Sequence, residues 1–183
     1  MKTINIIGSG SLGSFTALLL SKMAPAFGWK LKYYDFDSVE EKNRRNQFFR
    51  KSDIGRKKTL ALKEILDLFS DCQSEAIPEK ITSASELRGV VVVLVDKITE
   101  RIEILKSISY RAYIPLLIDA RSCGDVAIIY ALDPRDQDQV AKYQKTLETE
   151  GVAPAPCAHA GQLPIIFQIA ALIGQLLALF ESK

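Results

Sequence analysis

The chain has 183 residues, of which 48% are hydrophobic and 25% are charged, with 24 basic and 22 acidic side chains. This length suits one domain and this composition suits a packed soluble protein, which excludes a multi-module machine and a disordered chain. The net charge of +2 is unevenly distributed, because residues 1–63 carry +8 and residues 64–183 carry −6. We therefore expect a single domain over residues 1–183 that binds an anionic ligand near its N-terminal third.

The cysteines Cys72, Cys123 and Cys157 are odd in number and far apart. This pattern fits neither a disulfide framework nor a zinc site of paired Cys-x-x-Cys motifs. The first residues lead directly into a strand-like run, without the pattern of a signal peptide. The sequence thus predicts a cytoplasmic protein without zinc.

Short apolar runs alternate with helical patterns along most of the chain. Strict alternation of strand and helix predicts a Rossmann-like, doubly wound α/β fold, with a mostly parallel sheet and helices on both faces. The strand-like run 125–132 follows the run 115–119 after a short turn at Cys123-Gly124. This spacing favours an antiparallel hairpin at the edge of the sheet. Strands are expected at 3–7, 30–35, 77–82, 90–95, 115–119 and 125–132, and helices at 11–24, 54–70, 97–110, 135–149 and 163–179.

The C-terminal segment 163–180 is apolar apart from two glutamines and approaches the length of a membrane span. A tail anchor, a buried helix and a dimer face all produce such a pattern. Pro164, Gly174 and the two amides favour the buried helix or the dimer face. We expect no membrane association, and self-association through this helix.

The first expected strand is followed by a glycine-rich turn that opens a helix. Gly8, Gly10 and Gly13 have the spacing G-x-G-x-x-G in the context that gives the pattern its meaning. The first glycine allows a tight turn, the second lets a phosphate approach the backbone, and the third lets the helix pack closely on the strand. With the free N–H groups of the helix N-terminus, the turn predicts a phosphate site for either a dinucleotide or a mononucleotide.

Two carboxylates follow the second expected strand. Asp35 lies 22 residues after Gly13, where a carboxylate can accept hydrogen bonds from ribose hydroxyls. Asp37 is the third residue of the stretch Asp-Phe-Asp-Ser, which also suits a turn. The sequence predicts a ribose contact at Asp35 and leaves Asp37 as either a ligand or a turn residue.

Residues 42–58 carry eight basic side chains and one acid. A dinucleotide needs little of this charge, whereas a nucleoside triphosphate needs cations around its phosphates and the departing pyrophosphate. A solvated basic face is the plain alternative. Few aromatic residues are interleaved for base stacking, so we expect no nucleic-acid partner.

Taken in order, these stretches resemble the ThiF/MoeB-type adenylyltransferases, whose fold is shared by ubiquitin-activating enzymes. The resemblance covers residues 4–180 and rests on the glycine turn and four further stretches. These are Asp35-Phe36-Asp37-Ser38-Val39 followed by Asn43 and Gln47, residues 53–58 (Asp-Ile-Gly-Arg-Lys-Lys), Asp96 with Arg101, and residues 157–161 (Cys-Ala-His-Ala-Gly), in which His159 stands where the family has Glu.

The resemblance implies ATP and Mg²⁺ as cofactors and gives roles to the matching residues. Asp35 would hold the ribose of ATP and Lys58 would reach its phosphates. Asp96 would hold Mg²⁺ on ATP, although the local pattern also suits an N-cap for the helix that follows.

The α-phosphate contacts are the least regular part of the match. Asn43 and a nearby arginine would stabilise negative charge on the α-phosphate, with Gln47 beside them. The family pattern is roughly Asn-x-x-Arg-Gln, and here Asn46 occupies the arginine position. Arg45 is therefore expected to supply the guanidinium from one position earlier.

The implied reaction is adenylation of the C-terminal carboxylate of a small ubiquitin-like or sulfur-carrier protein that ends in Gly-Gly, by a homodimer or heterodimer. Some relatives use a cysteine for a thioester or persulfide, which makes Cys157 a candidate nucleophile; a small packed residue is the alternative. Relatives also contribute an arginine from a segment before the first strand, which these 183 residues do not include. An NAD(P)-dependent oxidoreductase and a non-catalytic, partner-binding subunit remain the alternative functions.

Overall fold

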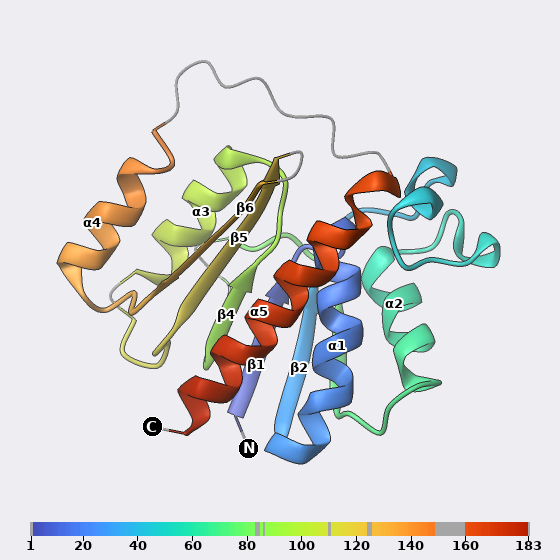
Figure 1. Cartoon of the computed structure of the whole chain (residues 1–183), viewed down its shortest axis with the longest axis horizontal. Coiled ribbons are helices and arrows are strands. Elements are labelled where there is room, and N and C mark those ends of the chain that lie inside the picture. Colours follow the sequence, from blue (N-terminus) through green and yellow to red (C-terminus); the bar gives the residue numbers. More distant parts are fainter. Residues whose placement is uncertain are drawn as a thin grey trace.

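The computed structural model describes residues 2–82, 85, 87–109, 111–123, 126–148 and 160–182. Six strands form one sheet in the order β3-β2-β1-β4-β5-β6 (Figure 1). Neighbouring strands are parallel except for β5 and β6, which are antiparallel, so the predicted fold and its edge hairpin are confirmed. The strands are β1 (Lys2–Ile7), β2 (Trp29–Tyr34), β3 (Ser74–Ile77), β4 (Val90–Val93), β5 (Leu117–Cys123) and β6 (Val126–Leu132).

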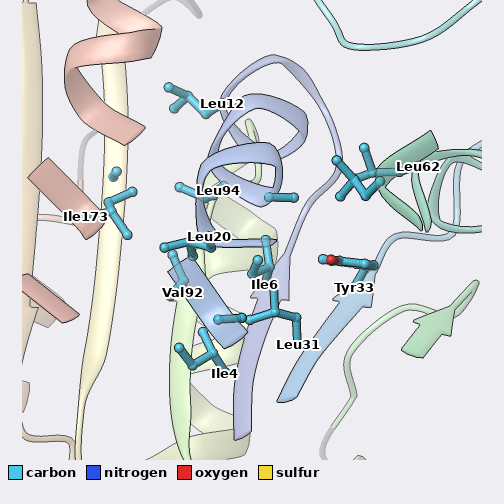
Figure 2. Close-up of a cluster of buried hydrophobic side chains, with 14 of the residues drawn as sticks. Ile4, Ile6, Leu12, Leu20, Leu31, Tyr33, Leu62, Val92, Leu94 and Ile173 are labelled. Atoms are coloured by element: carbon cyan, nitrogen blue, oxygen red, sulfur yellow. The ribbon is translucent and has the colours of Figure 1, made fainter. Parts of the chain in front are cut away.

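Helices cover both faces of the sheet. α1 (Ser11–Phe27), α2 (Lys58–Asp67) and α5 (Leu163–Glu181) share one apolar cluster with the sheet, and α3 (Ile98–Ile108) and α4 (Gln137–Lys145) share the other. Short 3₁₀ helices η1 (Glu41–Arg45), η2 (Lys51–Asp53) and η3 (Ala160–Gln162) complete the described elements. Figure 2 shows the first cluster, in which helix residues Leu12, Leu20, Leu62 and Ile173 lie near Ile4, Ile6, Leu31, Tyr33, Val92 and Leu94.

The central strand β4 explains why two helical layers are needed. All four of its valines are buried, with Val90 and Val92 in one cluster and Val91 and Val93 in the other. Side chains of a strand alternate between the two faces, so an unbroken valine run requires cover on both. At about 1.5–3 kcal/mol for each buried side chain, this strand alone contributes strongly to folding.

Two expected elements were placed wrongly. The strand expected at 77–82 is β3, which pairs with β2 only as far as Ile77 opposite Tyr34. Pro78 follows and has no N–H for a continued ladder. The helix expected from residue 54 begins at Lys58, because Val39 exchanges backbone hydrogen bonds with Gly55 and Arg56 and so holds that stretch extended.

α5 is the one described helix that is long and apolar enough to cross a membrane, a test that core helices of soluble proteins also pass. Here it packs against α1, β5 and β6 (Figure 1). Its C-terminal end is anchored by Glu181, which accepts a hydrogen bond from Trp29 Nε1 at 3.0 Å and pairs with Lys2 at 2.9 Å. One third of its most apolar window is buried, and Phe167, Leu172 and Leu179 remain exposed.

Candidate functional site

A cavity of about 280 Å³ lies at the carboxyl ends of the parallel strands. Its walls come from residues at or just beyond the ends of β1, β2, β3, β4 and β5. β1 and β4 are neighbours at the centre of the sheet, and the chain runs outward from them in opposite directions, which is where open α/β sheets bind ligands. The predicted site residues that line the cavity are Gly8, Gly10, Asp35, Asp37, Gln47, Lys58 and Asp96.

Other predicted site residues lie elsewhere. Gly13, Asn43 and Arg45 do not line the cavity. Cys157 and His159 lie outside the described residues, so the thiol nucleophile stays a prediction.

The glycine turn is fixed by close contacts with its surroundings, including the end of β4, the strand beside β1 in the sheet. Gly8 has φ of +98°, and a Cβ there would lie 2.8 Å from the carbonyl oxygen of Leu94. The backbone N–H of Ser9 donates to Asp35 Oδ2 at 2.7 Å. At Gly10, by contrast, a Cβ would meet nothing within 4 Å, and the residue faces the cavity. The turn therefore leaves room for a ligand at its second glycine.

Asp35 connects the glycine turn to the end of β2. Besides the bond from Ser9, its Oδ1 accepts the backbone N–H of Asp37 at 2.9 Å. Each carboxylate oxygen keeps accepting capacity after one such bond, so a ribose contact at Asp35 is compatible with this arrangement.

Asp37 and Lys58 form an ion pair at the cavity wall, with Lys58 Nζ 3.0 Å from Asp37 Oδ2. The backbone N–H of Lys58, at the start of α2, also donates to the carbonyl of Asp37 at 3.0 Å. Lys58 is only 7% exposed. An ammonium group has three donors, so Lys58 keeps two for an anion in the cavity.

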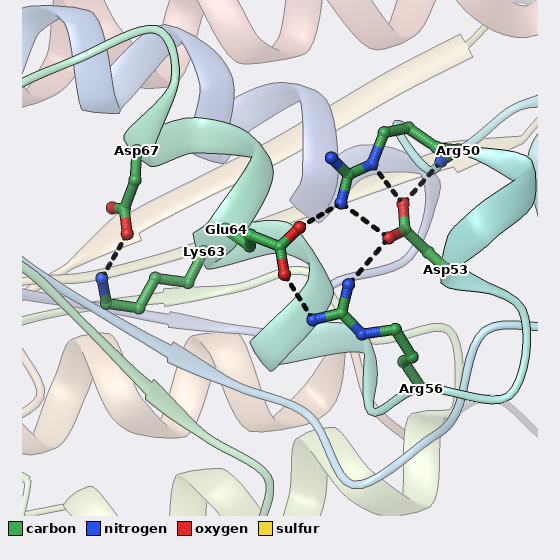
Figure 3. Close-up of polar contacts among 6 residues, drawn as sticks. All are labelled: Arg50, Asp53, Arg56, Lys63, Glu64 and Asp67. Atoms are coloured by element: carbon green, nitrogen blue, oxygen red, sulfur yellow. Dashed lines mark hydrogen bonds and ion pairs between the residues drawn. The ribbon is translucent and has the colours of Figure 1, made fainter.

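Acids close by neutralise most of the charge of residues 42–58. Figure 3 shows Arg50 and Arg56 pairing both with buried Asp53, at 2.8 and 3.1 Å, and with Glu64 of α2, at 2.6 Å each. Lys42 pairs with Glu40 and Arg44 with Glu41. Of these eight basic residues, only Lys58 lines the cavity, so most of the segment's positive charge does not face the ligand space.

The cluster of Arg50, Asp53, Arg56 and Glu64 predicts an acid-sensitive fold. Burial opposes ionisation of Asp53, but its hydrogen bonds with Arg50 and the charge of Arg56 hold the pKa of Asp53 below its ordinary value. Hydrogen bonds from Arg56 and Arg50 lower the pKa of Glu64 to about 2. Groups with a lowered folded pKa stabilise the fold above their unfolded pKa and lose this contribution as the pH falls through the folded value.

The free energies of unfolding of the wild type and of Glu64→Gln, measured with urea, should therefore differ most near pH 6. The difference should shrink progressively between about pH 4.5 and pH 2, where Glu64 becomes protonated in the folded state. Glu103→Gln is the control, because Glu103 pairs with Lys80 on the surface. A difference for Glu64→Gln that stayed constant down to pH 2 would contradict the assigned role.

The segment after η1 brings two amides to the cavity. Asn46 is 6% exposed, and its carbonyl accepts Ser11 Oγ–H at 2.8 Å. Gln47 Oε1 is buried and finds no hydrogen-bond partner among the residues described here. Asn43 sits behind them: its Oδ1 accepts the backbone N–H of Glu40 at 2.8 Å, and its carbonyl accepts that of Gln47 at 2.9 Å. Asn43 thus positions the segment, and Asn46, at the family's arginine position, faces the ligand space.

Asp96 follows β4 and is an exposed side chain of the cavity wall. The alternative of a helix N-cap was wrong, because α3 has Lys97 as its N-cap residue and no side-chain cap bond. Asp96 makes no hydrogen bond or ion pair with any residue that the structure describes. Glu100 lines the same wall, and burial raises its pKa, although Lys97 lies 3.7 Å away. The described residues contain no group of three His, Cys, Asp or Glu side chains that could hold a metal.

A pair of arginines in the cavity wall was given no role from the sequence. Arg101 of α3 and Arg121 of β5 both line the cavity and both pair with Asp119, which is fully buried. Burial, with a smaller effect from Arg121, lowers the pKa of Arg101 to about 10, so its guanidinium is charged at neutral pH. The available signal in the sequence was a pair of charged residues, Asp119 and Arg121, directly after the apolar run 114–118.

Several solved structures share this fold. E. coli MccB with AMPCPP and MccA matches with a TM-score of 0.70 and 18% identity, over 98% of this chain and 56% of that one. E. coli MccB with ATP matches with a TM-score of 0.64 and 19% identity, over 93% and 53%. E. coli tRNA N6-threonylcarbamoyladenosine dehydratase, TcdA, matches with a TM-score of 0.61 and 14% identity, over 100% and 88%. The chain therefore spans about half the length of the MccB chains.

Sequence comparison identifies the family. No curated protein has a significant sequence match to this chain. The model of the ThiF family, however, matches residues 2–178, which includes every element from β1 to most of α5. The order of strands, the fixed glycine turn and the cavity at the strand ends agree with that match, and the chain belongs to the ThiF family.

Proposed function

We propose that residues 1–183 form a single nucleotide-binding unit that adenylates a carboxylate with ATP. The observation that carries this proposal is one cavity that joins the glycine turn, Asp35, Lys58 and Asp96 at the switch point of the sheet. ATP would place its ribose at Asp35 and its α-phosphate over Gly10, where the backbone is open. MccB, a structural neighbour, was crystallised with ATP and with AMPCPP, and TcdA with AMP.

The reaction needs alignment and charge stabilisation more than it needs a protein nucleophile. A carboxylate oxygen attacks the α-phosphorus, the acyl–phosphate bond forms, and the bond to the bridging oxygen of the β-phosphate breaks to release pyrophosphate. Lys58 stabilises the phosphate charge with its two free donors, and the amide groups of Asn46 and Gln47 face the same space.

The carboxylate of Asp96 fits a Mg²⁺ site that is completed by nucleotide phosphates and water. It is exposed to the cavity, has no described partner, and offers the hard oxygen ligands that Mg²⁺ prefers. Bound there, Mg²⁺ would neutralise phosphate charge. Asp96 contributes a single carboxylate, which is the usual arrangement when the phosphates supply other ligands.

The carboxylate substrate is proposed to be the C-terminus of a small protein or peptide. The family resemblance implies a ubiquitin-like or sulfur carrier that ends in Gly-Gly, in the cytoplasm. MccB was crystallised together with MccA, which supports a small protein or peptide partner in general. Phe167, Leu172 and Leu179 of α5 are exposed and would serve contact with a second subunit.

Mg-ATP should stabilise the protein against heat. A ligand present at one hundred times its dissociation constant adds about 2.7 kcal/mol to the free energy of unfolding. For a domain of this size, we expect the melting temperature to rise by roughly 5–10 °C. NAD⁺ and NADH are the comparison ligands, measured by differential scanning fluorimetry. Stabilisation by NAD(H) and none by Mg-ATP would favour the oxidoreductase instead.

A ThiF-family subunit that binds nucleotide without catalysis is the second candidate function. One observation favours it: Arg45, the guanidinium expected at the α-phosphate, does not line the cavity. Exchange of radioactive pyrophosphate into ATP, in the presence of candidate carrier proteins, separates the two functions. Mg-ATP binding without any exchange would support the non-catalytic subunit.

A further inference from the structure

The connection between β4 and α3 carries Asp96, the proposed ligand of the metal on ATP. β4 ends at Val93 and α3 begins at Ile98, so only four residues join them. Leu94 makes the last backbone bond to β1, because its N–H donates to the carbonyl of Ile7 at 2.8 Å. The Asp96 side chain is exposed and makes no hydrogen bond or ion pair with any residue that the structure describes. Within this part of the chain, the backbone of residues 95–97 therefore decides where the carboxylate lies.

Arg101 holds this backbone on both sides of Asp96. A terminal nitrogen of its guanidinium donates to the carbonyl of Val95, the residue before Asp96. Its backbone N–H donates to the carbonyl of Lys97, the residue after Asp96, at 3.2 Å. The second bond belongs to any first turn of a helix, whereas the first depends on the arginine side chain. The side chain of Arg101 thus fixes the peptide bond between Val95 and Asp96.

The guanidinium of Arg101 is itself anchored on β5. It pairs with the fully buried carboxylate of Asp119, and the nitrogen that contacts Val95 also donates to the carbonyl of Ala120 at 3.3 Å. Asp119 lies opposite Val93, the last residue of β4, so this anchor stands beside the point where the chain leaves the strand. Arg101 is only 4% exposed. A buried side chain with partners on a neighbouring strand keeps one rotamer, and so keeps its contact with Val95 in one place.

We propose that Arg101 is a positioning residue, which orients the carboxylate of Asp96 toward the metal on ATP. It acts through the carbonyl of Val95 and depends on its anchor at Asp119. The inference rests on the proposed function for the metal role of Asp96. Groups that orient a metal ligand raise the affinity for the metal, because the ligand loses less freedom on binding. Lysine cannot replace the arginine, since an ammonium places all its donors at one point and a guanidinium spreads them over three nitrogens.

The test measures how much Mg²⁺ strengthens the binding of AMPCPP to the full chain. Calorimetric titrations with saturating Mg²⁺ and with EDTA give two affinities, and their ratio is the Mg²⁺ gain. In the wild type we expect a gain of about a hundredfold. In Arg101→Lys the gain should be about tenfold smaller. The affinity in EDTA should stay within about twofold of the wild type, because the glycine turn and Asp35 are unchanged. A general loss of stability would not separate these two affinities.

A double variant makes the test specific to positioning. Asp96→Ala should lose most of the Mg²⁺ gain. Adding Arg101→Lys to it should change the gain by less than about twofold, because there is then no ligand left to position. Arg101 itself lines the cavity, so direct contact between its guanidinium and a phosphate is the competing role. An effect of Arg101→Lys that persists in the Asp96→Ala background would show such direct contact and overturn the inference.

Arg56→Lys is the matched control, because Arg56 also pairs with a buried aspartate, Asp53, but does not line the cavity. It should keep the wild-type Mg²⁺ gain even where it destabilises the fold. In the Arg101 variants, Asp119 still has Arg121 at 2.8 Å, so the buried carboxylate remains paired. Arg101→Met fills a similar volume without a charge. It takes the place of Arg101→Lys if the lysine variant fails to fold, and should lose at least as much of the gain.

The remaining outcomes separate this inference from the proposed adenylation. A wild-type Mg²⁺ gain in the Arg101 variants would overturn the inference, and so would the absence of any gain in the wild type. Absence of pyrophosphate exchange, with a Mg²⁺ gain that depends on Arg101, would instead remove the adenylation and leave the positioning role in a nucleotide-binding subunit. Where exchange occurs, Arg101→Lys should lower its rate about tenfold to a hundredfold. The double variant should then be no slower than Asp96→Ala.

Discussion

Asp96→Ala is expected to lower the rate of pyrophosphate exchange by about a hundredfold to a thousandfold, the usual effect of removing one group that stabilises transition-state charge. Asp96 is exposed, lines the cavity and has no partner among the described residues, so its removal leaves no buried group unpaired. The free energy of unfolding should therefore change by less than about 0.5 kcal/mol. Exchange assays and urea unfolding on the same preparation measure the two effects.

Two comparisons make this result specific. Asp71→Ala removes another exposed aspartate that does not line the cavity, and it should leave exchange unchanged. Asp96→Asn keeps one oxygen ligand and should retain part of the activity, with a higher requirement for Mg²⁺. Full exchange activity in Asp96→Ala would remove the metal role from Asp96, and a large loss of stability would show that the residue is structural.

The parts of the fold that follow from local patterns were predictable. The unbroken valines of β4 require cover on both faces, and a helix follows each of the two central strands, α1 after β1 and α3 after β4. The glycine turn was recognisable because its three positions have distinct steric reasons. In the structure the turn and Asp35 lie together, because the N–H of Ser9, next to Gly8, donates to Asp35.

Contacts between residues far apart in the sequence determined two features that local patterns could not predict. The start of α2 depends on backbone hydrogen bonds between Val39 and residues 55–56, which lie 16 or more positions apart. The positive charge of residues 42–58 gave a similar difficulty, because a count of charges does not reveal that Glu64 faces Arg50 and Arg56. Local sequence reports the charge of a segment, whereas folding decides which partner neutralises it.

The cavity wall at β5 illustrates the same limit. Arg121 appears in the sequence as a polar residue at a strand end, and Asp119 as a charge within an apolar run. Their importance arises only when α3 brings Arg101 onto the same carboxylate. The site therefore combines a predictable half, the glycine turn with Asp35, and a half created by packing between distant elements.

The glycine turn gives the second large prediction, because two of its glycines should fail in different ways. A Cβ at Gly13 would lie 1.8 Å from the carbonyl oxygen of Gly8 and 2.7 Å from its carbonyl carbon. These are backbone atoms, so α1 must shift away from β1 to make room. We expect Gly13→Ala to lose about 3 kcal/mol or more of unfolding free energy, measured by urea denaturation.

Gly10→Ala is the matched partner of this variant, since it adds the same methyl group three residues earlier. Gly10 has φ of −74°, and its Cβ would meet no atom within 4 Å, so the fold should keep its stability within about 0.5 kcal/mol. That methyl group would instead occupy the space assigned to the α-phosphate, and ATP should bind about tenfold to a hundredfold more weakly. Unchanged ATP affinity in Gly10→Ala would contradict the placement of the phosphate at this turn. This holds even if Gly13→Ala is destabilised as expected, because Gly10 tests the space for the ligand and Gly13 tests the packing of the helix.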